Sequence, residues 1–156
     1  MSDVAPENAK EGIDLRPDGG VHLWLDGTKH RLRRPRGREF RKLREELQDH
    51  LDVINETSDE NLTWSQALLD RGDEREARGE PRITSEERAE DRRRGRAMRD
   101  MTENLLRGWW LSVIATLAVE ARDVDAEDLP PWLTGPAQAM LLLEHWRSVP
   151  SLSGAP

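Results

Sequence analysis

The stretch VHLWLDGTKHRLR, from Val21 to Arg33, decides the fold at the N-terminal side of this chain. Apolar and polar residues alternate on both sides of Asp26-Gly27. Asp-Gly between two such runs predicts a tight turn, because a type I′ turn needs positive φ at both central residues. In the resulting register Leu25 faces Thr28, Leu23 faces His30 and Val21 faces Leu32. We therefore expect a β-hairpin with one apolar face that a second element must cover.

The residues after Pro35 can supply that element. From Gly37 to Ile54 the apolar residues recur every three or four positions, which predicts an amphipathic helix that ends near Asn55. Residues 1–20 show no such periodicity and are expected to form a flexible arm. The first folded unit is therefore predicted over residues 21–55, as a hairpin and a helix whose apolar stripe is Phe40, Leu43, Leu47, Leu51 and Ile54.

The rest of the chain is predicted to be helical around a charged middle. Residues 56–83 are expected to form a polar connector that could contain one short helix. Thr84 followed by Glu87 is typical of a capping box and predicts a long helix over residues 84–122. Residues 123–148 are expected to be a Pro-rich connector and a C-terminal helix with Pro136 in its first turn, followed by a tail over 149–156. The predicted fold class is α+β and mostly α.

Composition excludes several classes of protein. The 156 residues suit one modest domain, and 35% of them are hydrophobic and another 35% charged. The absence of cysteine rules out disulfides, thiol catalysis and Cys-ligated metals. The longest uncharged apolar stretch runs only from Gly108 to Val119, and the chain starts without a signal peptide, so we expect a soluble intracellular protein without a membrane span.

Catalytic motifs are not found in the sequence. It lacks the Walker pattern, the dinucleotide glycine fingerprint, the nucleophile elbow and the paired-histidine zinc motif. Its four histidines are scattered singly, and most carboxylates lie among arginines, as on solvated helix faces. We expect no enzyme activity, no metal and no cofactor.

The clearest local feature is a change of charge sign along the first helix. Nine lysines and arginines lie between Lys29 and Arg44 against one acid, whereas residues 45–60 carry seven acids and no base. The basic part could follow phosphates of a nucleic acid, contact an acidic protein surface such as that of a second copy, or simply be solvated. The net charge of −7 and the lack of aromatic residues among these arginines disfavour nucleic acid. The candidate contact residues are Arg33, Arg34, Arg36, Arg38 and Arg41.

Apolar residues give a second set of candidates. The chain has more apolar helix surface than its small interior is expected to cover, so the face of Phe40, Leu43 and Leu47 is predicted to lie exposed and bind a partner. Trp109 and Trp110 are expected to pack in a C-terminal core with Trp132 and Trp146, or to form a groove for a partner.

Five motifs, in this order, carry a resemblance to a known family: VHLWLDG (21–27), RLRRP (31–35), GWW (108–110), LPPWL (129–133) and HWRSVP (145–150). Together they resemble small proteins of long-tailed bacteriophages that infect actinobacteria, which are assigned as tail assembly chaperones. The motifs lie towards both ends of the chain, and the charged middle matches no family.

The resemblance implies a non-enzymatic factor of the host cytoplasm that binds the tape measure protein, helps to recruit major tail protein subunits and is absent from the finished particle. Self-association of the chain would be compatible with this role. Two alternatives stay open: a permanent virion component, such as a capsid decoration or connector protein, and a small DNA-binding regulator.

Overall fold

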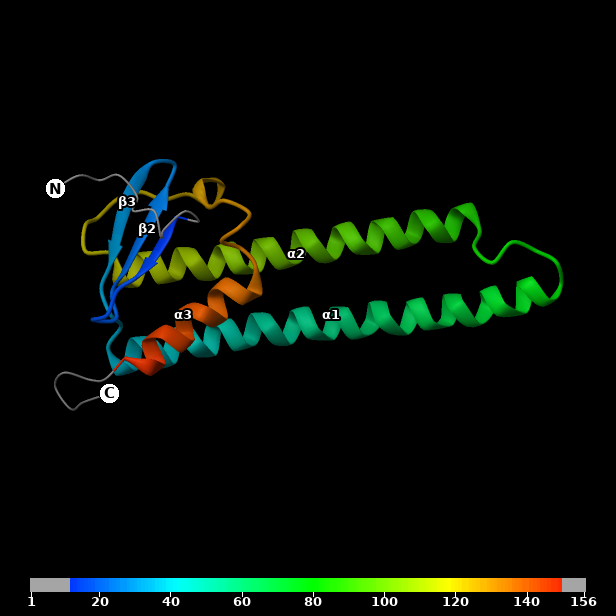
Figure 1. The fold of residues 1–156 in the computed structure, drawn as a ribbon, viewed down its shortest axis with the longest axis horizontal. Helices are drawn as coiled ribbons and strands as arrows, with labels where there is room; N and C mark the ends of the chain where they lie inside the picture. Colours follow the sequence, from blue (N-terminus) through cyan, green and yellow to red (C-terminus); the bar gives the residue numbers. More distant parts are fainter. Residues whose placement is uncertain (1–11, 150–156) are drawn as a thin grey trace.

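The computed structural model describes residues 12–149 and confirms an α+β, mostly helical fold (Figure 1). A small antiparallel sheet precedes two long helices and a short C-terminal one. None of the helices in the described part of the chain combines the length and hydrophobicity that a membrane span needs. In chain order the elements are β1 (Ile13–Leu15), β2 (Val21–Leu25), β3 (Thr28–Leu32), α1 (Gly37–Ala77), α2 (Ser85–Leu117), the 3-10 helix η2 (Ala126–Asp128) and α3 (Pro136–Ser148).

The hairpin of β2 and β3 has the register that the sequence predicts. Val21 pairs with Leu32, Leu23 with His30 and Leu25 with Thr28. The turn residues Asp26 and Gly27 both have positive φ, at 49° and 77°. The alternation of the apolar residues and the Asp-Gly turn therefore suffice to position this hairpin.

A third strand, β1, corrects the prediction of an arm over residues 1–20. Ile13 pairs with Leu23 and Leu15 with Val21, so β1 extends the sheet beside β2. Three residues are too few to show a period in the sequence, and the backbone of β2 is what holds them. The part of the predicted arm over residues 1–11 and the tail over 150–156 lie outside the described residues.

Helix α1 is far longer than predicted, and the connector predicted over residues 56–83 is wrong for most of its length. The helix continues past Asn55 without a break and ends at Ala77. The positions of α1 that face α2 continue at intervals of three or four residues through Thr57, Asn61 and Trp64 to Leu68. Because two of these four residues are polar, the apolar pattern in the sequence does not show that the helix continues. Only 78–84 form the link to α2.

Helix α2 begins at the predicted capping box and ends earlier than predicted. The backbone N–H of Glu87 donates to the Thr84 hydroxyl at 3.1 Å, and the N–H of Thr84 donates to the Glu87 carboxylate at 2.9 Å. At the other end the helix stops at Leu117 instead of continuing to residue 122, because the chain turns to pair with β3. The N–H of Val119 donates to the carbonyl of Arg31 at 2.9 Å, which covers the outer edge of that strand.

The described chain divides into a compact head and a projecting stalk (Figure 1). We call residues 12–54 and 106–149 the head, and residues 55–105 the stalk. The main core lies in the head, where the apolar face of the sheet meets the base of both long helices and α3. In the stalk only Leu68 and Gly72 are buried. The stalk is therefore a thin pair of antiparallel helices with little interior of its own.

Candidate functional site

The apolar face predicted on the first helix is not exposed. Leu43 and Leu47 retain 3% and 1% of their accessible surface, because they belong to the core shared with α2 and α3. Phe40 is half-buried, and its ring packs edge-on against Trp146 with 6.4 Å between ring centroids. The expectation of an exposed stripe is therefore wrong. The two long helices and α3 cover one another, which the local spacing of one helix cannot show.

The adjacent tryptophans of α2 are core residues. Trp109 and Trp110 are both 0% exposed and stack edge-to-face, with ring centroids 5.3 Å apart. The indole N–H of Trp109 donates to the carbonyl of Leu43 at 2.8 Å, so it ties α2 to α1. The first interpretation of these residues, packing in a core, is confirmed, and within the described chain neither ring lies at a surface where a partner could bind.

Two of the candidate arginines hold the head together. Arg33 donates two hydrogen bonds to the Glu39 carboxylate, at 2.7 and 2.6 Å, and one to the carbonyl of Thr116 at 3.1 Å. These hydrogen bonds lower the pKa of Glu39 to about 2. Arg34 donates to the carbonyl of Val149 at 2.7 Å. Both side chains thus connect the strand end to distant segments.

The remaining candidate arginines do lie at the surface. Arg36, Arg38 and Arg41 are exposed on the first turns of α1. Arg38 and Arg41 form no ion pair with any residue of the range 12–149. Of the five basic candidates, these three are the most exposed.

Polar contacts replace an apolar core along the stalk. The Thr57 hydroxyl lies 3.6 Å from the sulfur of Met101, and the guanidinium of Arg94 donates to the Asn61 side chain at 3.2 Å. The same guanidinium lies over the ring of Trp64, 4.9 Å from its centroid. These contacts fix how the helices face each other, but they bury little apolar surface, so we expect the stalk to be the less stable part of the described chain.

Ion pairs close the far end of the stalk. Glu87 accepts from Arg75, also lies 3.3 Å from Arg71, and has its pKa lowered to about 2 by the hydrogen bond from Arg75. Arg82 pairs with Asp73 at 2.6 Å and with Glu76. Arg82 thus ties the link to α1, and Glu87 ties the start of α2 to the end of α1.

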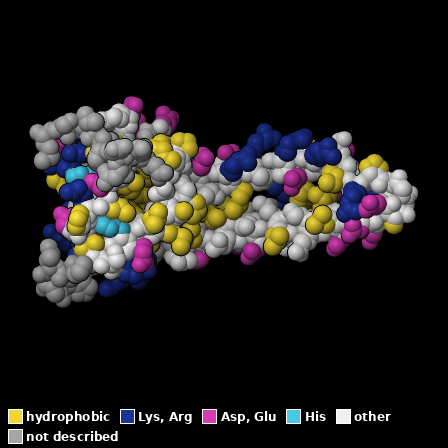
Figure 2. All heavy atoms as spheres, in the orientation of Figure 1, with side chains coloured by type: hydrophobic (Ala, Val, Ile, Leu, Met, Phe, Trp, Pro, Cys, Tyr) yellow, Lys and Arg dark blue, Asp and Glu magenta, His cyan; other side chains and the backbone are white. Residues whose placement is uncertain are grey.

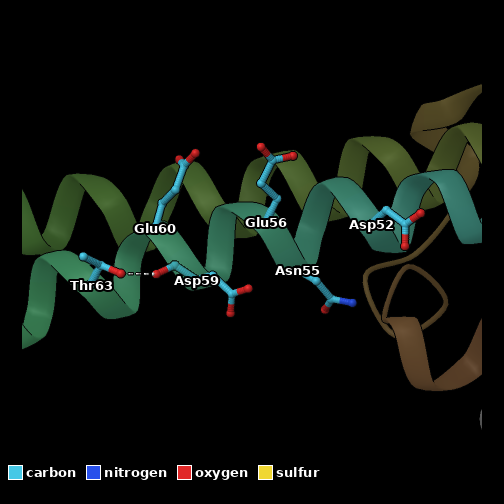
Figure 3. A pocket seen from close by; sticks show the side chains of 6 residues that line it. All are labelled: Asp52, Asn55, Glu56, Asp59, Glu60 and Thr63. Carbon is cyan, nitrogen blue, oxygen red and sulfur yellow. Dashed lines mark hydrogen bonds between the residues drawn. The ribbon is translucent and has the colours of Figure 1, made fainter.

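The face of α1 that points away from α2 is acidic. A shallow depression there is lined by carboxylates and two neutral polar side chains, and the hydroxyl of Thr63 donates to the carbonyl of Asp59 at 3.0 Å. Figure 3 shows these side chains projecting from α1 in front of α2. Within residues 12–149 no group of three or more His, Asp or Glu has the geometry to hold a metal ion. The lining residues are Asp52, Asn55, Glu56, Asp59, Glu60 and Thr63.

Exposed leucines add an apolar element to the stalk. Leu62 and Leu69 are 58% and 59% exposed and lie seven residues apart, so they project from the same side of α1. The head carries a comparable pair on α3, Met140 and Leu141, at 57% and 55%. Sequence reasoning missed the stalk leucines because it placed them in a connector. The available signal was the unbroken helical spacing from Thr57 to Leu68 without an intervening Gly or Pro.

Comparison with family models, with curated proteins and with solved structures finds no match to this chain.

Proposed function

We propose that this protein is a tail assembly chaperone of a long-tailed phage, which binds the tape measure protein and helps to recruit tail tube subunits without catalysing a reaction. The observation that carries the proposal is the stalk, a long helix pair with a small interior and a large accessible surface. A segment with so little core of its own is well suited to contacts with other chains.

The motifs behind the family resemblance support the proposal in one respect. Although these motifs are far apart in the sequence, their residues within 12–149 all lie in the head, and many of the side chains form its core. The resemblance therefore concerns the residues that build the head. The stalk, which matches no family, is the part that can differ according to the client.

A helical client fits the chemistry of the stalk. Leu62 and Leu69 present two apolar contacts separated by two helical turns, with Gln66 between them. An amphipathic helix that repeats an apolar residue every seven positions can meet both leucines at once. The surrounding charges keep the stalk soluble before the client binds.

Co-expression with segments of the tape measure protein, followed by pull-down, tests this function. We expect capture by the native chain and loss of capture when Leu62→Asp and Leu69→Asp are combined. These side chains are already exposed, so the substitutions leave the fold intact. The matched control combines Met140→Asp and Leu141→Asp, which changes two equally exposed apolar residues on α3.

Retained capture by the stalk variant, or equal loss in the control, would refute this assignment of the client surface. Substituting Leu43 instead would test only folding, because that side chain is buried. Mass spectrometry of mature virions separates the proposal from its alternative: a chaperone is absent from them, whereas a decoration or connector protein is present at fixed copy number.

A further inference from the structure

The outer face of α2 carries a row of arginines that the proposed function does not use. Arg88, Arg92, Arg96 and Arg99 follow one another at intervals of four, four and three residues, so they share one side of the helix. All four are exposed, and none forms an ion pair within residues 12–149. Figure 2 shows Lys and Arg side chains along the edge of the stalk that α2 forms.

Two nearby acids are engaged elsewhere, whereas Asp91 and Asp100 lie beside the row and form no ion pair within residues 12–149. Glu90 pairs with Arg93 at 2.7 Å and with Arg94 at 3.1 Å, which are not members of the row. Glu87 pairs with Arg75 and Arg71 of α1. The row therefore keeps an excess of positive charge, with four arginines against the two carboxylates of Asp91 and Asp100.

The outer face of α1 carries the opposite charge. Residues 45–70 contain no lysine or arginine. The acids of this stretch that point away from α2 are exposed; those from Asp49 to Glu60 extend over about 16 Å of helix, and Glu45 lies one turn before them on the same face. The members of this acidic row are Asp49, Asp52, Glu56, Asp59 and Glu60.

The two rows lie on opposite edges of the helix pair, and the acidic row begins in the head with Asp49 and Asp52. Asp59 is two residues from both Thr57 and Asn61, which face α2, and two residues correspond to more than half a helical turn. Arg96 is likewise two residues from Arg94, which faces α1, so Arg96 points away from α1. The stalk is therefore a flat rod with one basic and one acidic edge.

We propose that the arginine row of one copy of this protein docks on the acidic row of a second copy. The rows are opposite in charge, and each copy carries both. Such a contact joins two different surfaces, so it leaves one free row at each end and can be repeated along an array of stalks. Since the head is wider than the stalk, neighbouring copies are shifted along their length or point in opposite directions (Figure 1).

A second copy fits better than nucleic acid. A phosphate backbone would be attracted to the arginine row, but the acidic row on the same thin rod and the net charge of −7 would repel it. The acidic row of another copy offers the row of arginines a partner of opposite charge.

Sedimentation velocity of the full chain tests the contact in the absence of any client, and so independently of the proposed function. We expect a larger species at about 0.01 M salt that dissociates as salt approaches about 0.15 M, because the screening length falls from about 30 Å to about 8 Å. One variant reverses the basic row with Arg92→Glu, Arg96→Glu and Arg99→Glu. A second reverses the acidic row with Asp52→Lys, Glu56→Lys and Asp59→Lys.

Each variant alone is expected to stay monomeric, and an equimolar mixture is expected to restore the larger species, because the reversed rows complement each other. Recovery in the mixture also shows that both variants are folded. A competing control reverses Arg36, Arg38 and Arg41, the exposed arginines of the head that could also meet an acidic surface, by the same change to Glu. Because the contact is assigned to α2, this variant is expected to associate like the native chain.

Three results would overturn the proposal. They are a native chain that stays monomeric at low salt, a mixture that fails to associate, and a control that loses association as fully as the row variants. Salt-dependent binding of a DNA oligonucleotide by the native chain, abolished in the arginine variant, would assign the row to nucleic acid instead.

Discussion

Trp109 and Trp110 are neighbours in α2, both fully buried, and they differ in one hydrogen bond. The indole N–H of Trp109 donates to the carbonyl of Leu43 at 2.8 Å, whereas that of Trp110 has no acceptor among residues 12–149. Replacing each by Phe removes a similar volume of ring. The difference between the two variants therefore isolates the contribution of the hydrogen bond.

The expected difference follows from the free energies of buried polar groups. Trp109→Phe loses a hydrogen bond with a net value of about 0.5–1.5 kcal/mol, while Trp110→Phe removes a buried donor whose desolvation costs about 1–3 kcal/mol. Trp109→Phe should therefore be less stable than Trp110→Phe by about 2 kcal/mol or more.

Urea unfolding followed by circular dichroism measures this difference. With a denaturant slope of about 2 kcal/mol per molar urea, the midpoints of the two variants should lie about 1 M apart. Equal midpoints, or a lower midpoint for Trp110→Phe, would refute the assignment of the hydrogen bond as the tie between α1 and α2.

Three further predictions concern the head and the tip of the stalk. The pKa of Glu39 is lowered to about 2, whereas that of an unfolded Glu is about 4.3. The stabilisation that the Glu39 carboxylate provides is therefore complete above about pH 4.3 and is lost as the pH falls towards 2. The melting temperature of Glu39→Gln should accordingly depend less on pH in the acid range than that of the native chain. Gly95→Ala should raise the free energy of unfolding by about 0.5–1 kcal/mol in thermal unfolding. Gly72→Ala should not raise it, since the added Cβ would lie 3.0 Å from the carbonyl oxygen of Arg82. Equal stabilisation by both variants would contradict the close approach of the link to α1. Gly27→Val should lower the free energy of unfolding by about 1–2 kcal/mol, because the φ of this turn residue is 77°, and an unchanged denaturation midpoint would argue against the turn geometry.

The elements that the sequence predicts correctly are those with a local physical signal. Asp26-Gly27 demands a particular turn, and the capping box of Thr84 and Glu87 satisfies the free N–H groups at a helix start. Both are found as expected. Neither depends on which other elements lie nearby.

The length of α1 could not be inferred in the same way. At Thr57 and Asn61 the contact with α2 is made by polar side chains. The spacing of the apolar residues alone therefore indicates, wrongly, that the helix ends before Thr57. The exposure of Leu43 and Leu47 was misjudged for a related reason. Whether an apolar stripe is covered depends on segments that are more than sixty residues away, such as the part of α2 around Trp109.

The stalk leaves the head and returns to it at adjacent points, since near its base the hydroxyl of Thr57 lies 3.6 Å from the sulfur of Met101. The length of such a stalk is therefore independent of the structure of the head. Deleting seven residues from each helix would preserve the facing positions and shorten the reach by about 10 Å. The distance that the stalk extends from the head can thus change in steps of seven residues per helix, while the head stays the same.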